Sequence, residues 1–487
     1  MQKAVVIGSG FAGMASASVL AKQGVEVHLI DKNDQPGGRC RVWEHEGFTF
    51  DMGPSWYWMP DVFERFYERF GFTASDFYEL QRLDPSYKVF FEDSDIDVPA
   101  NFSEFCHLLD QWEEGASKKL TQFLADAKYK YEVGMQDLVY KPSFSVFEYA
   151  DFRLLTNLFK MNLFSSLQSE VRNLFTDSRI RQLLEFPVLF LGAKPSDTPA
   201  LYSLMNYADV KLGTWYPKGG MHEIAKAFAN IAKAQGVHFH LNEAVTGFDY
   251  ENRSIATVHT SERSYTNVDV VVSGADYHHV EQLLPKKYQS YSKAYWDSRK
   301  MAPSCLLYFV ALDKPLNNLQ HHNLFFDAEF DLHGEEIYDD PKWPTNPLFY
   351  ACVPSKTDET VSPKGCENLF LLMPIAPGLS ESESLHEEYF QRLMERLEEK
   401  TGQNIRSSVI FKRSFGVTDF QSTYNAFKGN AYGLANTLKQ TAVLKPKMKN
   451  KHLTNLFYCG QLTVPGPGVP PSIISGQVIA DYILKTI

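Results

Sequence analysis

The sequence predicts an α/β fold, and three features near its start carry this prediction. The apolar run KAVVI, from residue 3, is typical of a buried parallel strand because both of its faces are apolar. A helix is expected over residues 11–23, and a second strand, VEVHLI, ends at Asp31. The turn between the first strand and the helix has the spacing G-x-G-x-x-G: Gly8, Gly10 and Gly13. Together these features predict a Rossmann-like dinucleotide-binding unit.

Each glycine of this turn has a physical role. Gly8 allows the tight turn, Gly10 lets the backbone approach a pyrophosphate, and Gly13 lets helix and strand pack closely. The helix N-terminus then faces the phosphates. Asp31, 18 positions after the last glycine, is expected to accept a hydrogen bond from the adenosine ribose and disfavours the 2′-phosphate of NADP. This unit alone leaves the choice between NAD and FAD open.

Composition excludes one class of partner. The 487 residues are enough for two or three domains, with 44% hydrophobic and 22% charged residues. Aromatic residues make up 14%, which fits either a large apolar cavity or a large core. The net charge of −11 and the pI of about 5.7 argue against nucleic acid, which needs a clustered basic face.

Cysteine use and hydropathy indicate the location. Six cysteines are scattered without C-x-x-C spacing, as in a reducing compartment without disulfides. No uncharged apolar stretch reaches about 18 residues, so no spanning helix is expected. We therefore expect a cytoplasmic protein.

The residues after Asp31 settle the cofactor. They run KNDQPGGR and then EGFTFDMGPSWY. Here the chain resembles the FAD-dependent amine oxidase and phytoene desaturase superfamily, in which a Gly-Gly-Arg turn and an Asp-x-Gly-Pro segment follow the second strand. The matching positions are Gly37–Arg39 and Asp51–Pro54. Adjacent glycines bring backbone donors to the pyrophosphate, and Arg39 can lie against phosphate or flavin oxygens. The family usually has Glu at the position of Asp31, and the shorter carboxylate should still reach the ribose.

A second family-like patch spans residues 215–248. It predicts a Gly-Gly turn, an amphipathic helix and a strand that ends near Val245. The resemblance implies that Val245 contacts the adenine through its backbone. A further strand is expected at residues 268–273, followed by GADYHH. We predict no metal site, because four histidines lack carboxylate or Cys partners at ligand spacing: His278, His279, His321 and His322.

The third patch, residues 455–484, resembles the C-terminal flavin motif of bacterial-type phytoene desaturases. A buried strand, LFYCG, leads into a Gly/Pro-rich turn and a helix that begins near Pro470 or Pro471. The N–H groups of that helix start are expected to face the N1–C2=O edge of the flavin and to stabilise its reduced anion. Gln461, Leu462 and Pro471 depart from the commonest form of the motif, which bears on the substrate subtype.

The resemblance implies FAD as the cofactor, bound in a GR2-type Rossmann-like domain. The residues expected to contact FAD are Gly8, Gly10, Phe11, Ala12, Gly13, Asp31, Lys32, Gly37, Gly38, Arg39, Gly53, Pro54, Ser55, Val245, Gly460, Gln461, Gly468, Val469 and Pro470.

The resemblance runs through the whole chain and implies three parts. The FAD-binding domain is expected to be discontinuous, made of residues 1–100, 215–290 and 410–487. Residues 101–214 are expected to form a helical lid, and residues 291–409 an inserted mixed-sheet substrate domain. A lid helix could dip into a bilayer or pack on the core, and helical spacing alone fits both.

The function that the resemblance implies is carotenoid desaturation, with hydride transfer to the flavin. The substrate would be phytoene or a 1-hydroxylated acyclic or monocyclic carotenoid desaturated at its 3,4 bond, with oxygen or a quinone as electron acceptor. Peripheral association with the inner face of the cell membrane is expected. Asp151 and Arg153 lie where the family has groups proposed near the reactive end. The alternatives are an amine or porphyrinogen oxidase on the same fold, a carotene isomerase, or a flavin-binding scaffold without chemistry.

Overall fold

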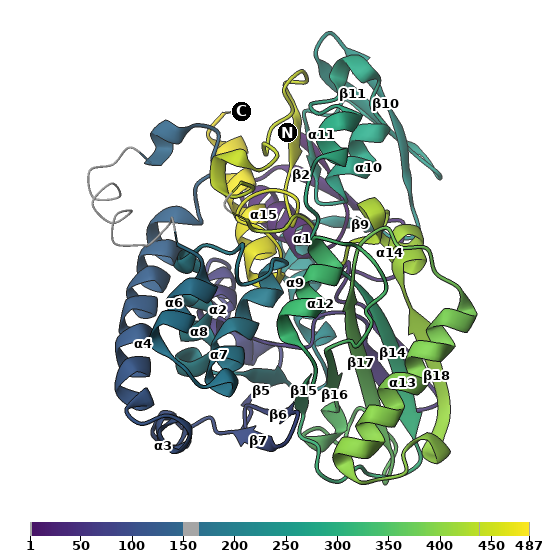
Figure 1. Ribbon diagram of the computed structural model, residues 1–487. Coiled ribbons are helices and arrows are strands. Elements are labelled where there is room, and N and C mark those ends of the chain that lie inside the picture. Colours follow the sequence, from purple (N-terminus) through teal and green to yellow (C-terminus); the bar gives the residue numbers. More distant parts are fainter. Residues whose placement is uncertain (1, 150–164, 438, 487) are drawn as a thin grey trace.

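The computed structural model describes residues 2–149, 165–437 and 439–486, and its centre is a parallel sheet of five strands (Figure 1). The order of the strands is β19 (Leu456–Tyr458), β13 (Val270–Ser273), β1 (Lys3–Ile7), β2 (Glu26–Ile30) and β9 (His238–His240). β1 pairs with β2 on one side and with β13 on the other. Lys3 is the first residue of β1, and the four residues that follow it are apolar and buried, as expected for a central parallel strand.

Helix α1 (Phe11–Lys22) follows β1 directly and is buried on all sides. Three other helices of this region are α2 (Pro60–Glu68), α9 (His222–Ala234) and α15 (Val469–Leu484). Alanines, serines and Gly13 make the surface of α1 narrow, so α15 and the sheet approach it closely. The expected first strand, helix and second strand are thus confirmed to within one or two residues.

The stretch around Val245 differs from the expectation. The strand after α9 is β9, and it ends at His240. Val245 instead begins β10 (Val245–Glu251), which pairs antiparallel with β11 (Ser254–Thr260), and β11 pairs with β12 (Ser264–Thr266). The four residues LNEA after His240 separate the two strands, and the boundary was concealed in the sequence because they include no glycine or proline.

A second sheet of seven strands is mixed. Its order is β18 (Val409–Phe415), β14 (Ser304–Leu312), β17 (Glu367–Ile375), β16 (Phe349–Cys352), β15 (His322–Phe326), β6 (Tyr87–Phe91) and β7 (Asp95–Val98). Strands β6, β7 and β18 lie beyond residues 291–409, the segment expected for this sheet. β6 pairs parallel with β15, and β18 pairs antiparallel with β14.

The two faces of this larger sheet have different neighbours. Leu306, Tyr308 and Val310 of β14 belong to the core cluster that includes helix α13 (Glu383–Thr401). The alternate residues Cys305, Leu307 and Phe309 belong to the cluster shared with the parallel sheet. Because side chains alternate along a strand, one face of the sheet packs on α13 and the other faces the middle of the molecule.

The remaining elements cover or connect these sheets. Two small two-stranded sheets are β3 (Val42–His45) with β4 (Phe48–Asp51), and β5 (Leu80–Arg82) with β8 (Trp215–Pro217). Helices gathered on one side of the molecule are α3 (Phe102–Trp112), α4 (Ala116–Val133), α6 (Leu167–Leu174), α7 (Ser178–Glu185) and α8 (Leu204–Tyr207) (Figure 1). The other helices are α10 (Tyr277–Gln282), α11 (Lys293–Asp297), α12 (Phe330–Tyr338) and α14 (Val417–Tyr424). Short helical turns are η1 (Ala74–Asp76), η2 (Gly134–Leu138), η3 (Val146–Tyr149), η4 (Phe186–Leu191), η5 (Ala200–Ser203), η6 (Ala208–Leu212), η7 (Lys286–Tyr288), η8 (Pro354–Lys356), η9 (Arg406–Ser408), η10 (Phe427–Gly429) and η11 (Ala442–Leu444).

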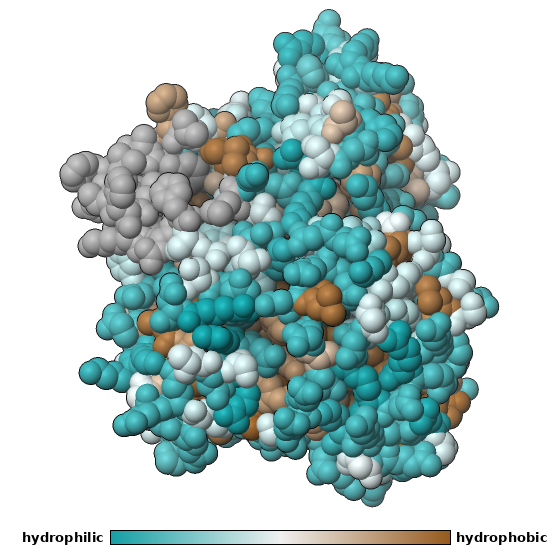
Figure 2. All heavy atoms as spheres, viewed as in Figure 1, coloured by the Kyte–Doolittle hydropathy of each residue, from teal (hydrophilic) through white to brown (hydrophobic). Residues whose placement is uncertain are grey.

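The surface on the face in view is largely hydrophilic, with hydrophobic residues in small groups (Figure 2). None of the described helices is both long enough and apolar enough to cross a bilayer.

The contact of α15 with α1 gives a stability prediction. A Cβ on Gly476 would lie 2.2 Å from the carbonyl oxygen of Ala12 and 2.9 Å from the Cβ of Ala15. We expect Gly476→Ala to lower the free energy of unfolding by about 1–3 kcal/mol, because the two helices must separate. The control is Gly247→Ala, where no atom lies within 4 Å of the new Cβ. Urea unfolding of both variants tests this, and equal midpoints would contradict it.

Candidate functional site

One cavity of about 880 Å³ runs between the two sheets. At one end it is lined by the glycine turn of β1 and α1, the end of β2 and the start of α15. At the other it is lined by the inner face of the seven-stranded sheet and by α12. Every residue expected to contact FAD lines this cavity except Gly13. The sequence patches at the two termini are therefore brought together in space.

The glycine turn is held by hydrogen bonds within the protein. The backbone N–H of Gly8, which has a φ of +93°, donates to the carbonyl oxygen of Ile30 at 2.7 Å. A Cβ on Gly13 would lie 1.9 Å from the oxygen of Gly8, so Gly13 is required for close packing. A Cβ on Gly10 would instead meet nothing nearer than Gly38 Cα at 3.9 Å. Protein packing thus explains Gly13 but leaves the space beside Gly10 open.

Asp31 has a structural partner that the sequence did not reveal. Both the N–H and the hydroxyl of Ser9 donate to Asp31 Oδ2 at 2.7 Å. Asp31 Oδ1 accepts from the N–H of Asn33 at 2.9 Å. Oδ1 accepts only this one hydrogen bond from the described residues and can accept a second, so contact with a ribose hydroxyl stays a prediction. The neighbouring Lys32 donates to the carbonyl oxygen of Ser422 at 2.5 Å.

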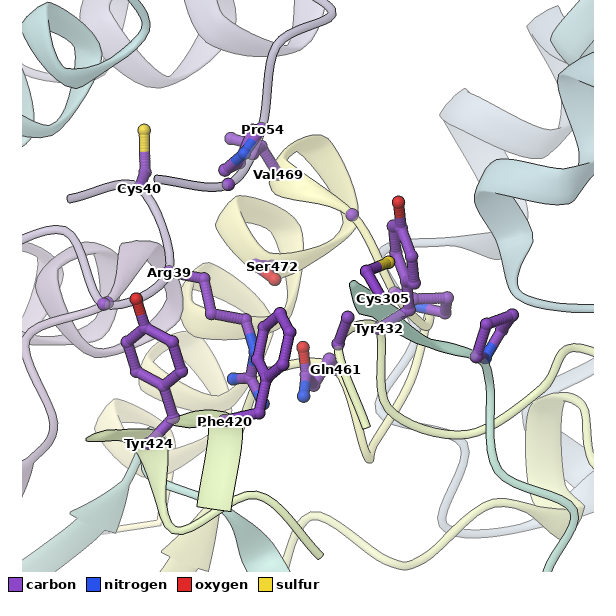
Figure 3. A pocket seen from close by; sticks show the side chains of 18 of the residues that line it. Arg39, Cys40, Pro54, Cys305, Phe420, Tyr424, Tyr432, Gln461, Val469 and Ser472 are labelled. Carbon is purple, nitrogen blue, oxygen red and sulfur yellow. The ribbon is translucent and has the colours of Figure 1, made fainter. Parts of the chain in front are cut away.

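The guanidinium of Arg39 lies in the middle of the cavity wall. It donates to the carbonyl oxygen of Asn430 at 3.2 Å, and its carbon lies 5.2 Å from the ring centre of Tyr424. With the Gln461 amide oxygen turned toward it, that oxygen lies 3.0 and 3.2 Å from the two terminal nitrogens. Figure 3 shows Arg39 between Tyr424 and Gln461. Its Nε is buried and has no partner among the described residues, so one donor remains for a bound group.

Buried carboxylates complete this end of the cavity. Asp276 begins α10 by accepting from the N–H of His279 at 3.0 Å, and it also accepts from the N–H of Phe427 at 3.2 Å. Burial lowers the pKa of Arg39 and raises that of Asp276, while the attraction between the two opposes both shifts. Glu243, just before Val245, accepts from the hydroxyls of Thr260 and Tyr265.

The start of α15 offers fewer donors than a helix N-terminus usually does. The helix begins at Val469, after Gly468 with a φ of +106°. Pro470 and Pro471 have no N–H, and the N–H of Ser472 is used by the carbonyl oxygen of Gly468 at 3.1 Å. Several exposed N–H groups were expected here. Within the described first turn of α15, only the N–H of Val469 remains as a donor.

The far end of the cavity is aromatic and apolar. Ring centres of Trp56 and Trp58 lie 5.2 Å apart, and those of Phe186 and Phe326 lie 5.9 Å apart. Cys305 and Tyr432 also line the cavity, and Figure 3 shows them on the side of Gln461 that faces away from Arg39. The aromatic content therefore serves a cavity as well as the core.

Titratable groups in the chamber are held neutral. His333 accepts from the N–H of Leu348 and donates to the oxygen of Pro374, and burial lowers its pKa to about 4. Burial raises the pKa of Cys305 to about 12 and that of Tyr350 well above its usual value.

Charged groups occur at the mouth of the chamber, where they are paired. Arg172 of α6 bonds Asp331 of α12 at 2.9 Å and Glu185 at 2.8 Å, and Lys194 pairs with Asp339.

The structure adds several residues to the site that sequence reasoning missed. They line the cavity without belonging to a quoted glycine motif: Glu243, Asp276, Cys305, Tyr350, Phe420, Tyr424, Asn425 and Ser472. Asp276 lies within the family-like GADYHH turn, so a signal for it existed. The candidates Asp151 and Arg153 lie outside the described residues and stay predictions. The view that no cysteine accompanies His321 and His322 was wrong, because the sulfur of Cys352 lies 3.8 Å from Nδ1 of His322.

Comparisons with known proteins agree with this geometry. The flavin-containing amine oxidoreductase family matches residues 11–484. A carotenoid 3,4-desaturase of Haloarcula japonica is 38% identical over 485 residues, which cover 99% of this chain and 98% of that protein. A zeta-carotene-forming phytoene desaturase of Myxococcus xanthus is 28% identical, with coverage of 99% and 94%. An oxidoreductase of Methanosarcina mazei has a similar structure, with a TM-score of 0.65, 18% identity and coverage of 99% and 100%.

The segment that leads to Pro54 gives a pH prediction. Asp51 accepts from the N–H of Met221 and His222 at the start of α9 and bonds Nδ1 of His222 at 3.1 Å. Burial lowers the pKa of His222, but hydrogen bonds to Asp51 and Glu223 outweigh it and raise the pKa to about 9. Because this pKa exceeds its value of about 6.5 in the unfolded chain, the stabilisation is complete below pH 6.5 and is lost as pH rises through 9.

We therefore expect His222→Gln to lower stability at pH 6 and to make little difference at pH 10. The difference in free energy of unfolding between the two proteins should shrink by at most about 1.4 kcal/mol for each unit of pH. Unfolding of both proteins between pH 6 and 10 measures this, with the exposed His238→Gln as control. A gap that stays constant with pH would contradict the pairing.

Proposed function

Because the chain belongs to the flavin-containing amine oxidoreductase family, we propose that it is an FAD-dependent carotenoid desaturase. The observation that carries this proposal is the continuous cavity, which joins the dinucleotide-binding turns to an apolar aromatic chamber. Its cofactor is FAD. The proposal is supported by the relatives named as carotenoid 3,4-desaturase and phytoene desaturase, whose similarity spans nearly the whole chain.

The residues at the cofactor end fit FAD. The space beside Gly10 is open although the neighbouring backbone of Gly38 is close, as a pyrophosphate needs. The unpartnered Nε of Arg39 provides a charged donor in the wall. We propose that Gly10 and the Gly37–Gly38 turn hold the pyrophosphate, Asp31 and Glu243 the ribose side, and Arg39 with the Val469 N–H the flavin side. When bound, FAD supplies hydride acceptance from a C–H carbon.

The chamber supplies positioning and exclusion of water. Trp56, Trp58 and Phe186 give flat apolar walls for a long unsaturated chain, and transfer of apolar surface from water stabilises it by about 25 cal/mol per Å². One ion pair, Arg172 with Asp331, joins α6 to α12 on one side of the mouth. We propose that the parallel sheet carries the cofactor and the larger sheet the substrate, with the expected lid over the chamber.

We propose 3,4-desaturation as the specific reaction. The support is the higher identity to the carotenoid 3,4-desaturase, 38%, than to the phytoene desaturase, 28%. Apolar walls discriminate poorly between chains of similar shape, at about 1–3 kcal/mol per methylene. A hydroxylated carotenoid and phytoene are therefore the two substrates to compare.

We also propose peripheral membrane association, with oxygen or a quinone as electron acceptor. Phe147 and Leu444 are large apolar side chains that are 82% and 53% exposed. They lie on neighbouring segments, because Lys447 donates to the backbone oxygens of Ser143, Phe144 and Val443. Exposed apolar groups beside lysines are typical of proteins that bind an anionic membrane surface.

The function is tested by incubating the protein, FAD and liposomes with phytoene and, separately, with a 1-hydroxylated acyclic carotenoid. We expect new red-shifted absorption bands with the hydroxylated carotenoid, because one more conjugated double bond is formed. New bands with phytoene alone would indicate a phytoene desaturase and not a 3,4-desaturase. No change with either substrate, while an amine or porphyrinogen reduces the flavin, would contradict the desaturase proposal.

The role of Arg39 is tested by flavin content. We expect Arg39→Lys to purify with at least about 10-fold weaker FAD binding, because a lysine cannot bond Asn430, Gln461 and a flavin oxygen together. The control is Arg41→Lys, because Arg41 pairs with the exposed Asp34 outside the cavity. The ratio of flavin to protein absorbance, followed by FAD titration, gives the result. Equal FAD binding by the two variants would contradict the proposal that Arg39 contacts the flavin.

A further inference from the structure

Three metal-ligating side chains meet in the seven-stranded sheet, away from the cofactor end. They are His321 just before β15, His322 at the start of β15 and Cys352 at the end of β16, and all are at most 3% exposed. His322 and Cys352 are directly opposite in the antiparallel register. One ligand atom from each residue lies within 4.8 Å of the other two. Atoms that share one ion lie about 3.5 Å apart, given bonds of about 2.0–2.3 Å, so side-chain rotations could close the site.

Each imidazole has one ring nitrogen fixed by a hydrogen bond, and the sulfur of Cys352 lies 3.8 Å from the fixed nitrogen of His322. His321 bonds the hydroxyl of Thr357 through Nδ1 at 2.6 Å, and His322 bonds the hydroxyl of Tyr350 through Nδ1 at 2.6 Å. Such a bond at one ring nitrogen fixes the ring so that the other can bind a metal. Nε2 of His322 is buried without a partner among the described residues. A buried polar atom of this kind is rare unless a bound group satisfies it.

The donor set selects the kind of ion. Two imidazoles and one sulfur suit the soft or borderline cations Cu⁺ and Zn²⁺ better than Mg²⁺ or Ca²⁺. A small cavity of about 20 Å³ beside His321 and Cys352 has room for one water as a further ligand.

We propose that His321, His322 and Cys352 bind one thiophilic cation, Cu⁺ or Zn²⁺. The sulfur–metal bond forms as the S–H bond of Cys352 breaks, and the proton leaves to solvent without any change of oxidation state. With Cu⁺ the thiolate leaves the site neutral, which suits its burial, whereas Zn²⁺ leaves one positive charge.

The bound ion would stiffen the wall of the substrate chamber. Trp56 stacks on His322 with ring centres 4.1 Å apart and planes 9° apart, and Tyr350 bonds the same ring. Both Trp56 and Tyr350 line the chamber. The ion would therefore join β15 to β16 directly behind two residues of the chamber wall. This role needs no particular reaction, so binding can be tested without an activity assay.

The experiment is equilibrium dialysis of the holoenzyme against Zn²⁺ and, anaerobically with a reductant, against Cu⁺, followed by metal analysis. We expect one equivalent bound to the wild-type protein and none to Cys352→Ser or His322→Gln at the same free metal. The matched control is Cys305→Ser, a buried cysteine on β14 beside Tyr432, which should bind as the wild type does. Thr357→Val, which removes only the bond to His321, should weaken binding by about 10–100-fold.

Flavin content and circular dichroism of each variant show whether it is folded. Co²⁺ provides a second readout, because a cobalt–thiolate bond adds charge-transfer absorption that Cys352→Ser must lack. Failure of the wild type to bind either ion stoichiometrically would overturn the proposal and leave a hydrogen-bonded cluster only. Retention of the ion by folded Cys352→Ser would overturn it as well.

Discussion

The close approach of α1 to its neighbours is the constraint on which the rest of the structure depends. Gly13 allows the helix to lie against the oxygen of Gly8, and Gly476 allows α15 to lie against the oxygen of Ala12. These two contacts bring the first turn of the chain and the last helix to one place. The residues that begin α1 and those that begin α15 therefore line the same cavity although they lie more than 450 positions apart. Any side chain at either glycine would separate the two halves of the flavin site.

The same constraint explains what the sequence could predict. The strands and helix of the first 31 residues follow from local periodicity and turn glycines, and the structure confirms them. Gly8, Gly10 and Gly468 lie in the cavity as expected, because their role is set by backbone geometry within a few positions. The boundary at Val245 was misplaced because the turn before it is only four residues long, with no glycine or proline to mark it.

Contacts between segments far apart in the chain could not be predicted from the sequence. The bond from Arg39 to Asn430 and the stacking of Trp56 on His322 depend on how the two sheets face each other. Cys352 follows His322 by 30 positions, and only the register of β15 and β16 places it opposite. The hydrogen bonds from Ser9 to Asp31 could not be predicted, because no sequence pattern distinguishes a buried serine in a glycine turn from a solvent-exposed serine. A single sequence contains no direct record of these pairings.

The distribution of charge along the cavity bears on the kind of substrate. At the cofactor end, Arg39, Asp276 and Glu243 are buried and held by hydrogen bonds or mutual attraction. In the chamber, burial lowers the pKa of His333 and raises that of Cys305 and Tyr350, so these groups are neutral at physiological pH. The charged residues Lys194, Asp331 and Glu335 line this end of the cavity but are partly or fully exposed, and Lys194 and Asp331 pair with other side chains. Transfer of an ammonium group into this chamber would be costly because the described carboxylates that line it, Asp331 and Glu335, are exposed on α12 and do not lie among the buried apolar walls. A long neutral hydrocarbon meets no such cost, which is why the chamber favours a carotenoid over an amine although both classes of enzyme share the flavin end.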